Sequence, residues 1–104
     1  MGLFSFNDPP RRVITSDEFD RVLNIMKDRH RALPHDVFER WRAMAEGHMK
    51  ESGPYRGMDE KELKSYIKKL PIITPEAYRS VINDFHDELQ KALEKSRYGS
   101  TSPF

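Results

Sequence analysis

Residues 73–95, with the sequence ITPEAYRSVINDFHDELQKALEK, are expected to form the helix on which the rest of the chain packs. Apolar residues recur in this stretch at three- and four-residue steps, which places them along one side of a helix. They are Tyr78, Val81, Ile82, Phe85, Leu89, Ala92 and Leu93. Thr74 can cap this helix, Pro75 suits its first position and Glu76 favours the positive end of its dipole. The remaining segments must supply a surface that covers the apolar side.

A first helix is predicted over about residues 15–31 from two start signals. Thr15 and Glu18 have the spacing of a capping box, in which each side chain satisfies a backbone amide at the start of the helix. Ile14 and Phe19 have the spacing of a hydrophobic staple across the same start. The two signals together locate the beginning of this helix.

Two more helices are predicted, over about residues 34–51 and 59–70. Pro34 suits the first turn of the earlier one, which is expected to continue until a glycine and a proline interrupt it. Asp59 has the residue type of a cap for the later one. Pro71 is expected to end that helix, because the residue before a proline is disfavoured in helical conformation.

With the long helix over about residues 74–96, these segments predict an all-α protein built as a compact four-helix domain. We expect an irregular N-terminal head over residues 1–13, the helical domain over 14–97 and a flexible tail over 98–104. No segment alternates apolar and polar residues for long enough to predict a strand. Trp41 is expected to be the largest core contributor outside the long helix.

Length, net charge and hydrophobicity limit the number of domains, the kinds of partner and the cellular location that the sequence predicts. The chain has 104 residues, which is enough for one domain with one core. Its formal net charge of +1 provides no overall field that would recruit nucleic acid or an anionic membrane. No apolar run reaches the roughly 18 residues of a membrane span, so we expect no membrane insertion and a cytoplasmic protein.

Catalytic and metal-binding patterns are missing from the sequence. There is no cysteine, no glycine-rich phosphate loop and no paired helical histidine motif, so we predict no enzyme activity, no metal and no cofactor. His30 and His35 are separated by the break at Pro34, which gives them no converging geometry. The segment 51–62 has the length of a calcium-binding loop but too few oxygen ligands. His30 and His48 are expected to be hydrogen-bonded histidines at helix interfaces.

The function predicted from these features is protein–protein interaction, as an adaptor, an inhibitor or a regulator. The candidate partner-binding residues are Leu3, Phe4 and Phe6 in the head, together with Ile25, which lies outside the apolar stripe of its helix. Two interpretations of the head remain open. The head either packs back on the bundle or orders only against a partner, at a cost in backbone entropy of about 1–2 kcal/mol per residue.

The alternative function is that of a helix-turn-helix-like regulator that binds nucleic acid. Its candidate residues are Arg29, Arg31, Arg40, Arg42, Lys61, Lys64 and Lys68. Acidic residues dilute both basic clusters, and the helix that would read the groove carries Glu76, Asp84, Asp87 and Glu88. Those carboxylates would meet phosphate with the wrong sign, so nucleic acid is the second choice of partner.

Overall fold

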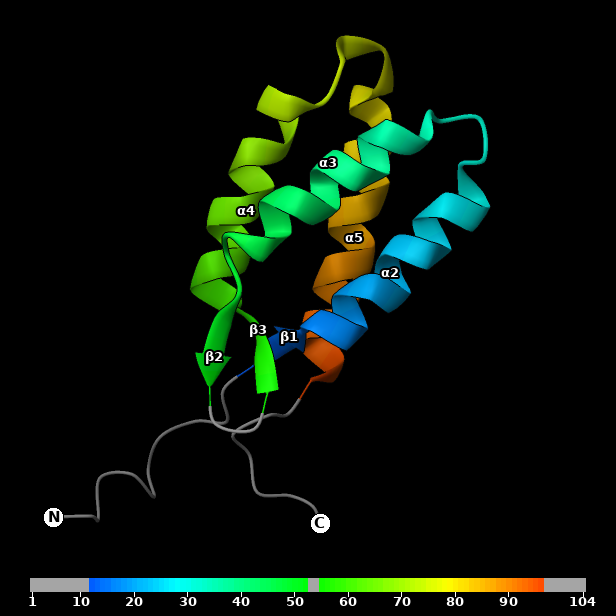
Figure 1. Cartoon of the computed structure of the whole chain (residues 1–104). Helices are drawn as coiled ribbons and strands as arrows, with labels where there is room; N and C mark the ends of the chain where they lie inside the picture. The colour runs from blue at the N-terminus through cyan, green and yellow to red at the C-terminus, as the bar shows by residue number, and fades with distance from the viewer. Residues whose placement is uncertain (1–11, 53–54, 97–104) are drawn as a thin grey trace, which may run out of the picture.

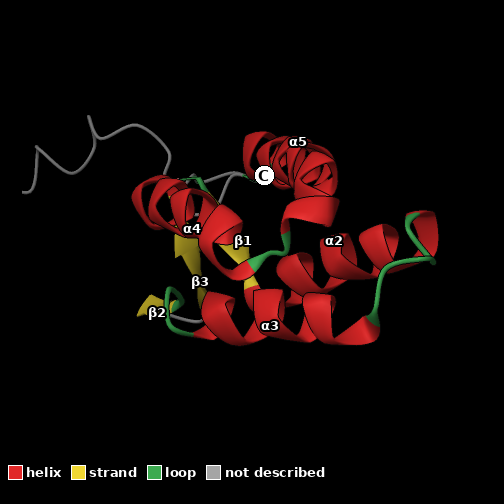
Figure 2. Cartoon of the chain, turned by 90° about the horizontal axis from the view of Figure 1, so that it is seen from above, coloured by secondary structure: helices red, strands yellow, loops and turns green. Residues whose placement is uncertain are grey.

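The computed structural model describes residues 12–52 and 55–96, and this part of the chain forms four α-helices, one 3-10 helix and three short strands (Figure 1). In chain order the elements are β1 (Val13–Thr15), α2 (Ser16–Arg29), α3 (His35–Glu46), β2 (Lys50–Ser52), β3 (Tyr55–Asp59), α4 (Glu60–Ile73), η1 (Glu76–Tyr78) and α5 (Arg79–Lys95). The predicted four-helix domain is confirmed. Viewed from above, the four helices surround one interior (Figure 2).

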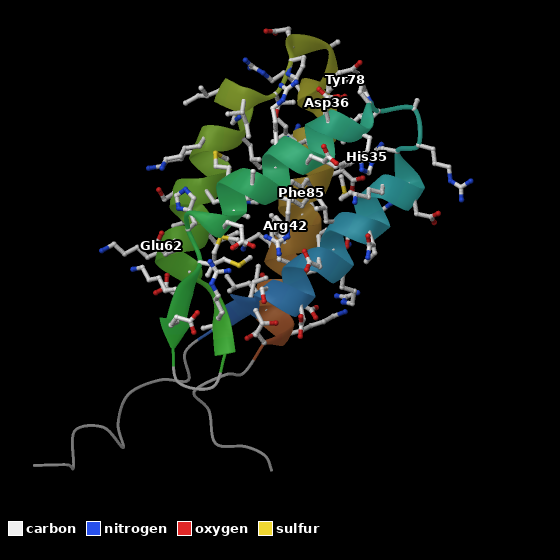
Figure 3. All side chains as sticks on the ribbon, viewed as in Figure 1. His35, Asp36, Arg42, Glu62, Tyr78 and Phe85 are labelled. Atoms are coloured by element: carbon white, nitrogen blue, oxygen red, sulfur yellow. The ribbon has the colours of Figure 1, made fainter. Side chains whose placement is uncertain are left out.

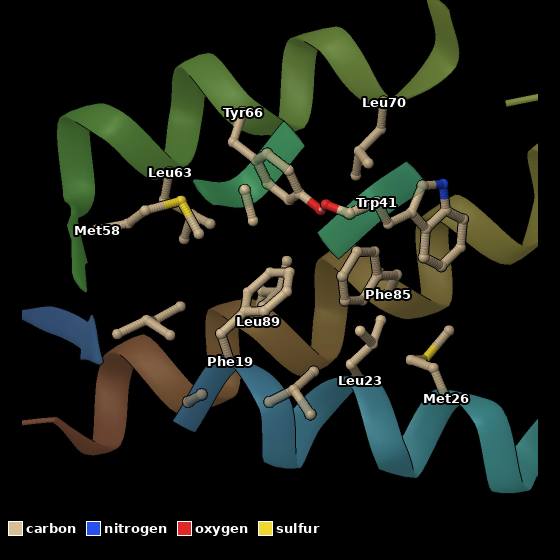
Figure 4. Close-up of a cluster of buried hydrophobic side chains, with 14 of the residues drawn as sticks. Phe19, Leu23, Met26, Trp41, Met58, Leu63, Tyr66, Leu70, Phe85 and Leu89 are labelled. Carbon is tan, nitrogen blue, oxygen red and sulfur yellow. Dashed lines mark hydrogen bonds between the residues drawn. The ribbon is translucent and has the colours of Figure 1, made fainter. Parts of the chain in front are cut away.

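The helix α5 buries its apolar side in this interior, as predicted. Its buried residues are Val81, Ile82, Phe85, Leu89, Ala92 and Leu93. The indole of Trp41 on α3 stacks on the ring of Phe85, with centroids 4.6 Å apart and planes 7° apart. Phe19 of α2 and Tyr66 of α4 meet Phe85 edge-on (Figure 4). Side chains from all four helices therefore share one aromatic centre.

The predicted caps of two helices are confirmed. The Thr15 hydroxyl accepts a hydrogen bond from the Glu18 amide at 3.1 Å, and the Asp59 carboxylate accepts one from the Glu62 amide at 2.9 Å. Each cap satisfies an amide that has no partner within its own helix. None of the helices in the described ranges is both long and apolar enough to cross a bilayer.

The expectation that the chain contains no strand is wrong. The strands form an antiparallel sheet in the order β1-β3-β2, at the end of the bundle where the described chain begins and finishes (Figure 1). Strands of three to five residues are too short for alternation to be recognised. Ile14 pairs with Met58 across the sheet, and both side chains are fully buried. Ile14, a staple residue of the sequence pattern, is thus also a strand residue of the core.

Two helix ends differ from the prediction. The helix α3 stops at Glu46 rather than near residue 51, because Gly47 and His48 form a turn that leads into β2. The helix α4 continues through Pro71 to Ile73. A proline removes one amide donor and disturbs one carbonyl four residues back, and a helix can tolerate that loss in its last turn.

The predicted start of the long helix is also wrong. Thr74 ends α4 and does not cap α5, because its hydroxyl accepts a hydrogen bond from the buried Trp41 indole at 2.8 Å. The segment Glu76–Tyr78 forms a 3-10 turn, and α5 begins only at Arg79. A long-range partner therefore takes the side chain that a local cap would have used.

The predicted head and tail fall largely outside the described residues. Val13, which the prediction included in the irregular head, belongs to β1, where its amide donates to the Ser96 hydroxyl. Leu3, Phe4 and Phe6 lie outside the described residues, as does the predicted tail over 98–104. Both interpretations of the head stay predictions.

Candidate functional site

The four arginines proposed for nucleic-acid binding are all engaged with carboxylates. The ion pairs are Arg29–Asp84, Arg29–Glu88, Arg31–Asp28, Arg40–Asp36, Arg42–Asp20 and Arg42–Glu46. The Arg42 side chain, labelled in Figure 3, joins α3 to α2 through Asp20 and lies over the ring of Phe19. The structure distributes these arginines among helix contacts and does not gather them into one cationic surface.

The three lysines proposed for the same function lie on one side of α4. Lys61, Lys64 and Lys68 are separated by three and four residues, which aligns them along a helix. All three are exposed, and within residues 12–52 and 55–96 none of them forms an ion pair. The opposite side of α4 buries Leu63, Tyr66 and Leu70 in the core.

An apolar residue extends the same line of side chains. Ile72 follows Lys68 by four residues and is 80% exposed, and it is the one large hydrophobic residue of the described chain with such exposure. We define the lysine face as Lys61, Lys64, Lys68 and Ile72. At a rise of about 1.5 Å per residue, this face extends for roughly 16 Å along α4. Figure 1 shows α4 at the outer edge of the bundle.

The acidic residues near the start of α4 do not neutralise this face. Glu60 and Glu62 are each one residue from Lys61 and therefore point about 100° to either side of it. Glu60 also precedes Lys64 by four residues, but within the described ranges the two side chains form no ion pair. Glu62, labelled in Figure 3, is also turned toward Lys50 of β2, whose ammonium lies 2.9 Å from its carboxylate. Within the described residues, no carboxylate therefore forms an ion pair with the lysine face.

The remaining predicted partner-binding residue is Ile25, which is partly buried on α2 and so presents less apolar surface than Ile72. Sequence reasoning missed Ile72 because Pro71 was taken to end the helix. Had the helical pattern been continued past that proline, Ile72 would have fallen beside Lys68 and away from the stripe of Leu63 and Leu70.

A second polar cluster lies where α3 and β2 meet α4. The imidazole of His48, which is only 7% exposed as a residue, has Nδ1 at 3.2 Å from a Glu62 oxygen and Nε2 at 3.3 Å from the Lys69 ammonium. The edge of the Tyr66 ring packs against it. We define the His48 cluster as His48, Glu62, Lys69 and Lys50. Hydrogen bonds from Lys50 and His48 lower the pKa of the Glu62 carboxyl.

The predicted roles of two histidines as interface residues are confirmed. His48, in the turn that follows α3, lies 3.2 Å from the Glu62 carboxylate of α4, and His30 lies 2.7 Å from the Asp84 carboxylate of α5. Within the part of the chain that the structure describes, no three histidine, aspartate or glutamate side chains are grouped as metal ligands. Most of the segment tested as a calcium loop is instead paired in β2 and β3.

Comparison with protein-family models, with curated proteins and with solved structures finds no match to this chain. The lysine face and the His48 cluster are therefore the two features from which its function can be inferred.

Proposed function

We propose that the chain is a protein-binding module, an adaptor, inhibitor or regulator, that docks an acidic segment of another protein on the lysine face. One observation carries this proposal: three exposed lysines, which form no ion pair within residues 12–52 and 55–96, lie in line with an exposed isoleucine. Lysines that form no ion pair within the described ranges can bind carboxylates of another protein without first breaking an ion pair in their own chain. Such charge complementarity speeds association and selects the partner.

Ile72 supplies the apolar part of the interaction. Burying an isoleucine side chain that was exposed stabilises a complex by about 1.5–3 kcal/mol. The matching partner is a segment with carboxylates spaced along one side and an apolar side chain at one end. An amphipathic helix with acidic residues three and four apart has this pattern.

Binding of nucleic acid is the second candidate, because the same lysines could contact phosphates. Two features make it weaker. The arginines that would extend the contact are already paired with carboxylates, and the net charge of the chain is only +1. Ile72 would also have no role on a phosphate backbone.

A selection from a random peptide library tests the proposal with the full chain as bait. We expect the enriched peptides to carry several aspartates or glutamates and one bulky apolar residue. The triple variant Lys61→Glu, Lys64→Glu, Lys68→Glu should lose these peptides. The triple variant Lys27→Glu, Lys91→Glu, Lys95→Glu is the control of equal net charge on α2 and α5 and should keep them. Its helical circular dichroism is checked first, because Lys91 lies 3.8 Å from Glu88 and Lys27 is partly buried.

The variant Ile72→Ser separates the two candidates. Peptide affinity should fall about tenfold or more, since the burial energy above exceeds the 1.4 kcal/mol that corresponds to a factor of ten. A random 20-base-pair duplex serves as the second probe. Duplex binding that is lost in the lysine triple variant and kept in Ile72→Ser would assign the face to nucleic acid. Equal loss of peptides in both triple variants would remove the lysine face from consideration.

A further inference from the structure

The His48 cluster places the acceptor nitrogen of a histidine beside a lysine amine. We propose that Lys69 is an acylation site that reacts with anionic acyl donors such as acyl phosphates, with His48 as the general base. This inference does not depend on the proposed protein binding, because Lys69 is not part of the lysine face.

The donor and acceptor roles follow from the partners of the imidazole. An ammonium can only donate hydrogen bonds, so Nε2 of His48 accepts from Lys69 at 3.3 Å. A carboxylate can only accept, so Nδ1 carries the proton and donates to Glu62 at 3.2 Å. The ring is therefore neutral, and its one lone pair points at the lysine amine. A histidine in this tautomer, held by a carboxylate, is the arrangement of a general base.

Burial keeps the imidazole in that orientation. His48 is held by Glu62 and by the edge of the Tyr66 ring, with centroids 5.8 Å apart. Lys69 itself is exposed, so a soluble reagent can reach its amine. Lys68, the residue before it, has no ion pair within the described ranges and provides positive charge that attracts a phosphate group.

The reaction balances as an acyl transfer. Nε2 of His48 first takes one proton from the Lys69 ammonium, which leaves a neutral amine with a free lone pair. That amine attacks the carbonyl carbon of the acyl phosphate. The bond between the carbonyl carbon and the phosphate oxygen breaks, the second amine proton leaves with the phosphate as hydrogen phosphate, and the imidazolium releases its proton to water. The products are an amide on Lys69, inorganic phosphate and one proton.

Acetyl phosphate is the probe, and the acetylated peptides of the intact chain are quantified over time by mass spectrometry. Lys61, Lys64 and Lys68 are internal references on the same helix. We expect Lys69 to be acetylated at least about tenfold faster than the three reference lysines. A well-positioned general base contributes roughly hundredfold or more to a rate, so a tenfold difference is a conservative threshold. Equal rates at the four lysines would overturn the proposal.

Variants assign the effect to the cluster. His48→Gln should reduce the rate at Lys69 to that of the references, and His35→Gln, which changes an exposed histidine at the start of α3, should leave it unchanged. Glu62 is a positioning residue, so Glu62→Ala should slow Lys69 and Glu62→Gln, which keeps a carbonyl acceptor, should restore most of the rate. A rate at Lys69 that is unaffected in folded His48→Gln would refute the role of the base.

A pH series of the unaltered chain provides the test if His48→Gln does not fold. The titratable groups facing His48 are Glu62, Tyr66 and Lys69 of α4, and Lys50 of β2 reaches it through Glu62. Acid that protonates the imidazole removes the lone pair. The ratio of the Lys69 rate to the Lys64 rate should then fall toward one, while the ratio of Lys61 to Lys64 stays constant. A Lys69 ratio that is independent of pH would contradict the proposal.

Discussion

Replacing Gly57 by alanine tests whether β1 and β3 are paired as the structure shows. Gly57 lies opposite Thr15 in the sheet. A Cβ atom built on Gly57 overlaps the Ile14 carbonyl oxygen and lies 2.9 Å from Cα of Thr15. Ordinary contact between carbon atoms requires about 3.5–4.0 Å, so the strands must separate by roughly 1 Å. Both neighbours are backbone atoms, which cannot rotate away.

The expected cost has two parts. Overpacking a close contact costs about 1–3 kcal/mol. Separating the strands also weakens one or two hydrogen bonds, each with a net value of about 0.5–1.5 kcal/mol. We therefore expect Gly57→Ala to lower the free energy of unfolding by roughly 1.5–6 kcal/mol, measured by urea denaturation followed by circular dichroism.

Gly47 provides the matched control. A Cβ atom there meets its nearest neighbour, the Met44 carbonyl oxygen, at 3.5 Å, which is ordinary contact, and the backbone is right-handed helical, with φ of −70°. Gly47→Ala should be neutral or stabilise the fold by about 0.4–1 kcal/mol, because alanine restricts the unfolded chain. If residues 50–59 were an open loop, the two substitutions would have similar effects. Equal stabilities of the two variants would refute the sheet.

Three further measurements probe the core, the ion pairs and the exposed face. Thr74→Val should lower the free energy of unfolding by about 1–3 kcal/mol, because the buried Trp41 indole would lose its acceptor. Trp41→Phe combined with Thr74→Val should cost less than the sum of the two single changes. Hydrogen bonds from Arg42 and Arg56 lower the pKa of the Glu46 carboxyl below its ordinary 4.5. A carboxyl with a lowered pKa in the folded state adds stability above its unfolded pKa and loses it as the pH falls through its folded pKa. The melting temperature should therefore drop below about pH 4.5, and Glu46→Gln should reduce that drop. Ile72→Ser should change the free energy of unfolding by no more than about 0.5 kcal/mol, the usual range for surface substitutions, because Ile72 is 80% exposed.

Local sequence determined the helices and two of their starts. The capping contacts of Thr15 and Asp59 involve residues three positions away, so their spacing alone predicts them. The stripe on α5 repeats with the period of the helix over most of its length, so the buried side could be identified without knowing what covers it. Trp41 could be assigned to the core from its size and its position in a helical pattern, and it is fully buried.

Tertiary contacts decided the features that sequence reasoning missed. Each strand is too short to show a period, and β1 becomes a strand only because β3, some 40 residues later, pairs with it. Thr74 has the residue type of a cap, but the Trp41 indole needs a buried acceptor and takes its hydroxyl. Pro71 lies in the last turn of α4, which packing on the core carries through to Ile73.

The candidate sites divide in the same way. Lys61, Lys64 and Lys68 could be identified from their spacing on one helix. That they form no ion pair in the described part of the chain depends on where its acidic side chains lie in space. The exposure of Ile72 and the meeting of His48 with Glu62 and Lys69 depend likewise on how α4 packs against α3. Periodicity along the chain determines which face of a helix a residue occupies. The partners on that face come from segments distant in sequence, and only the packed structure brings them together.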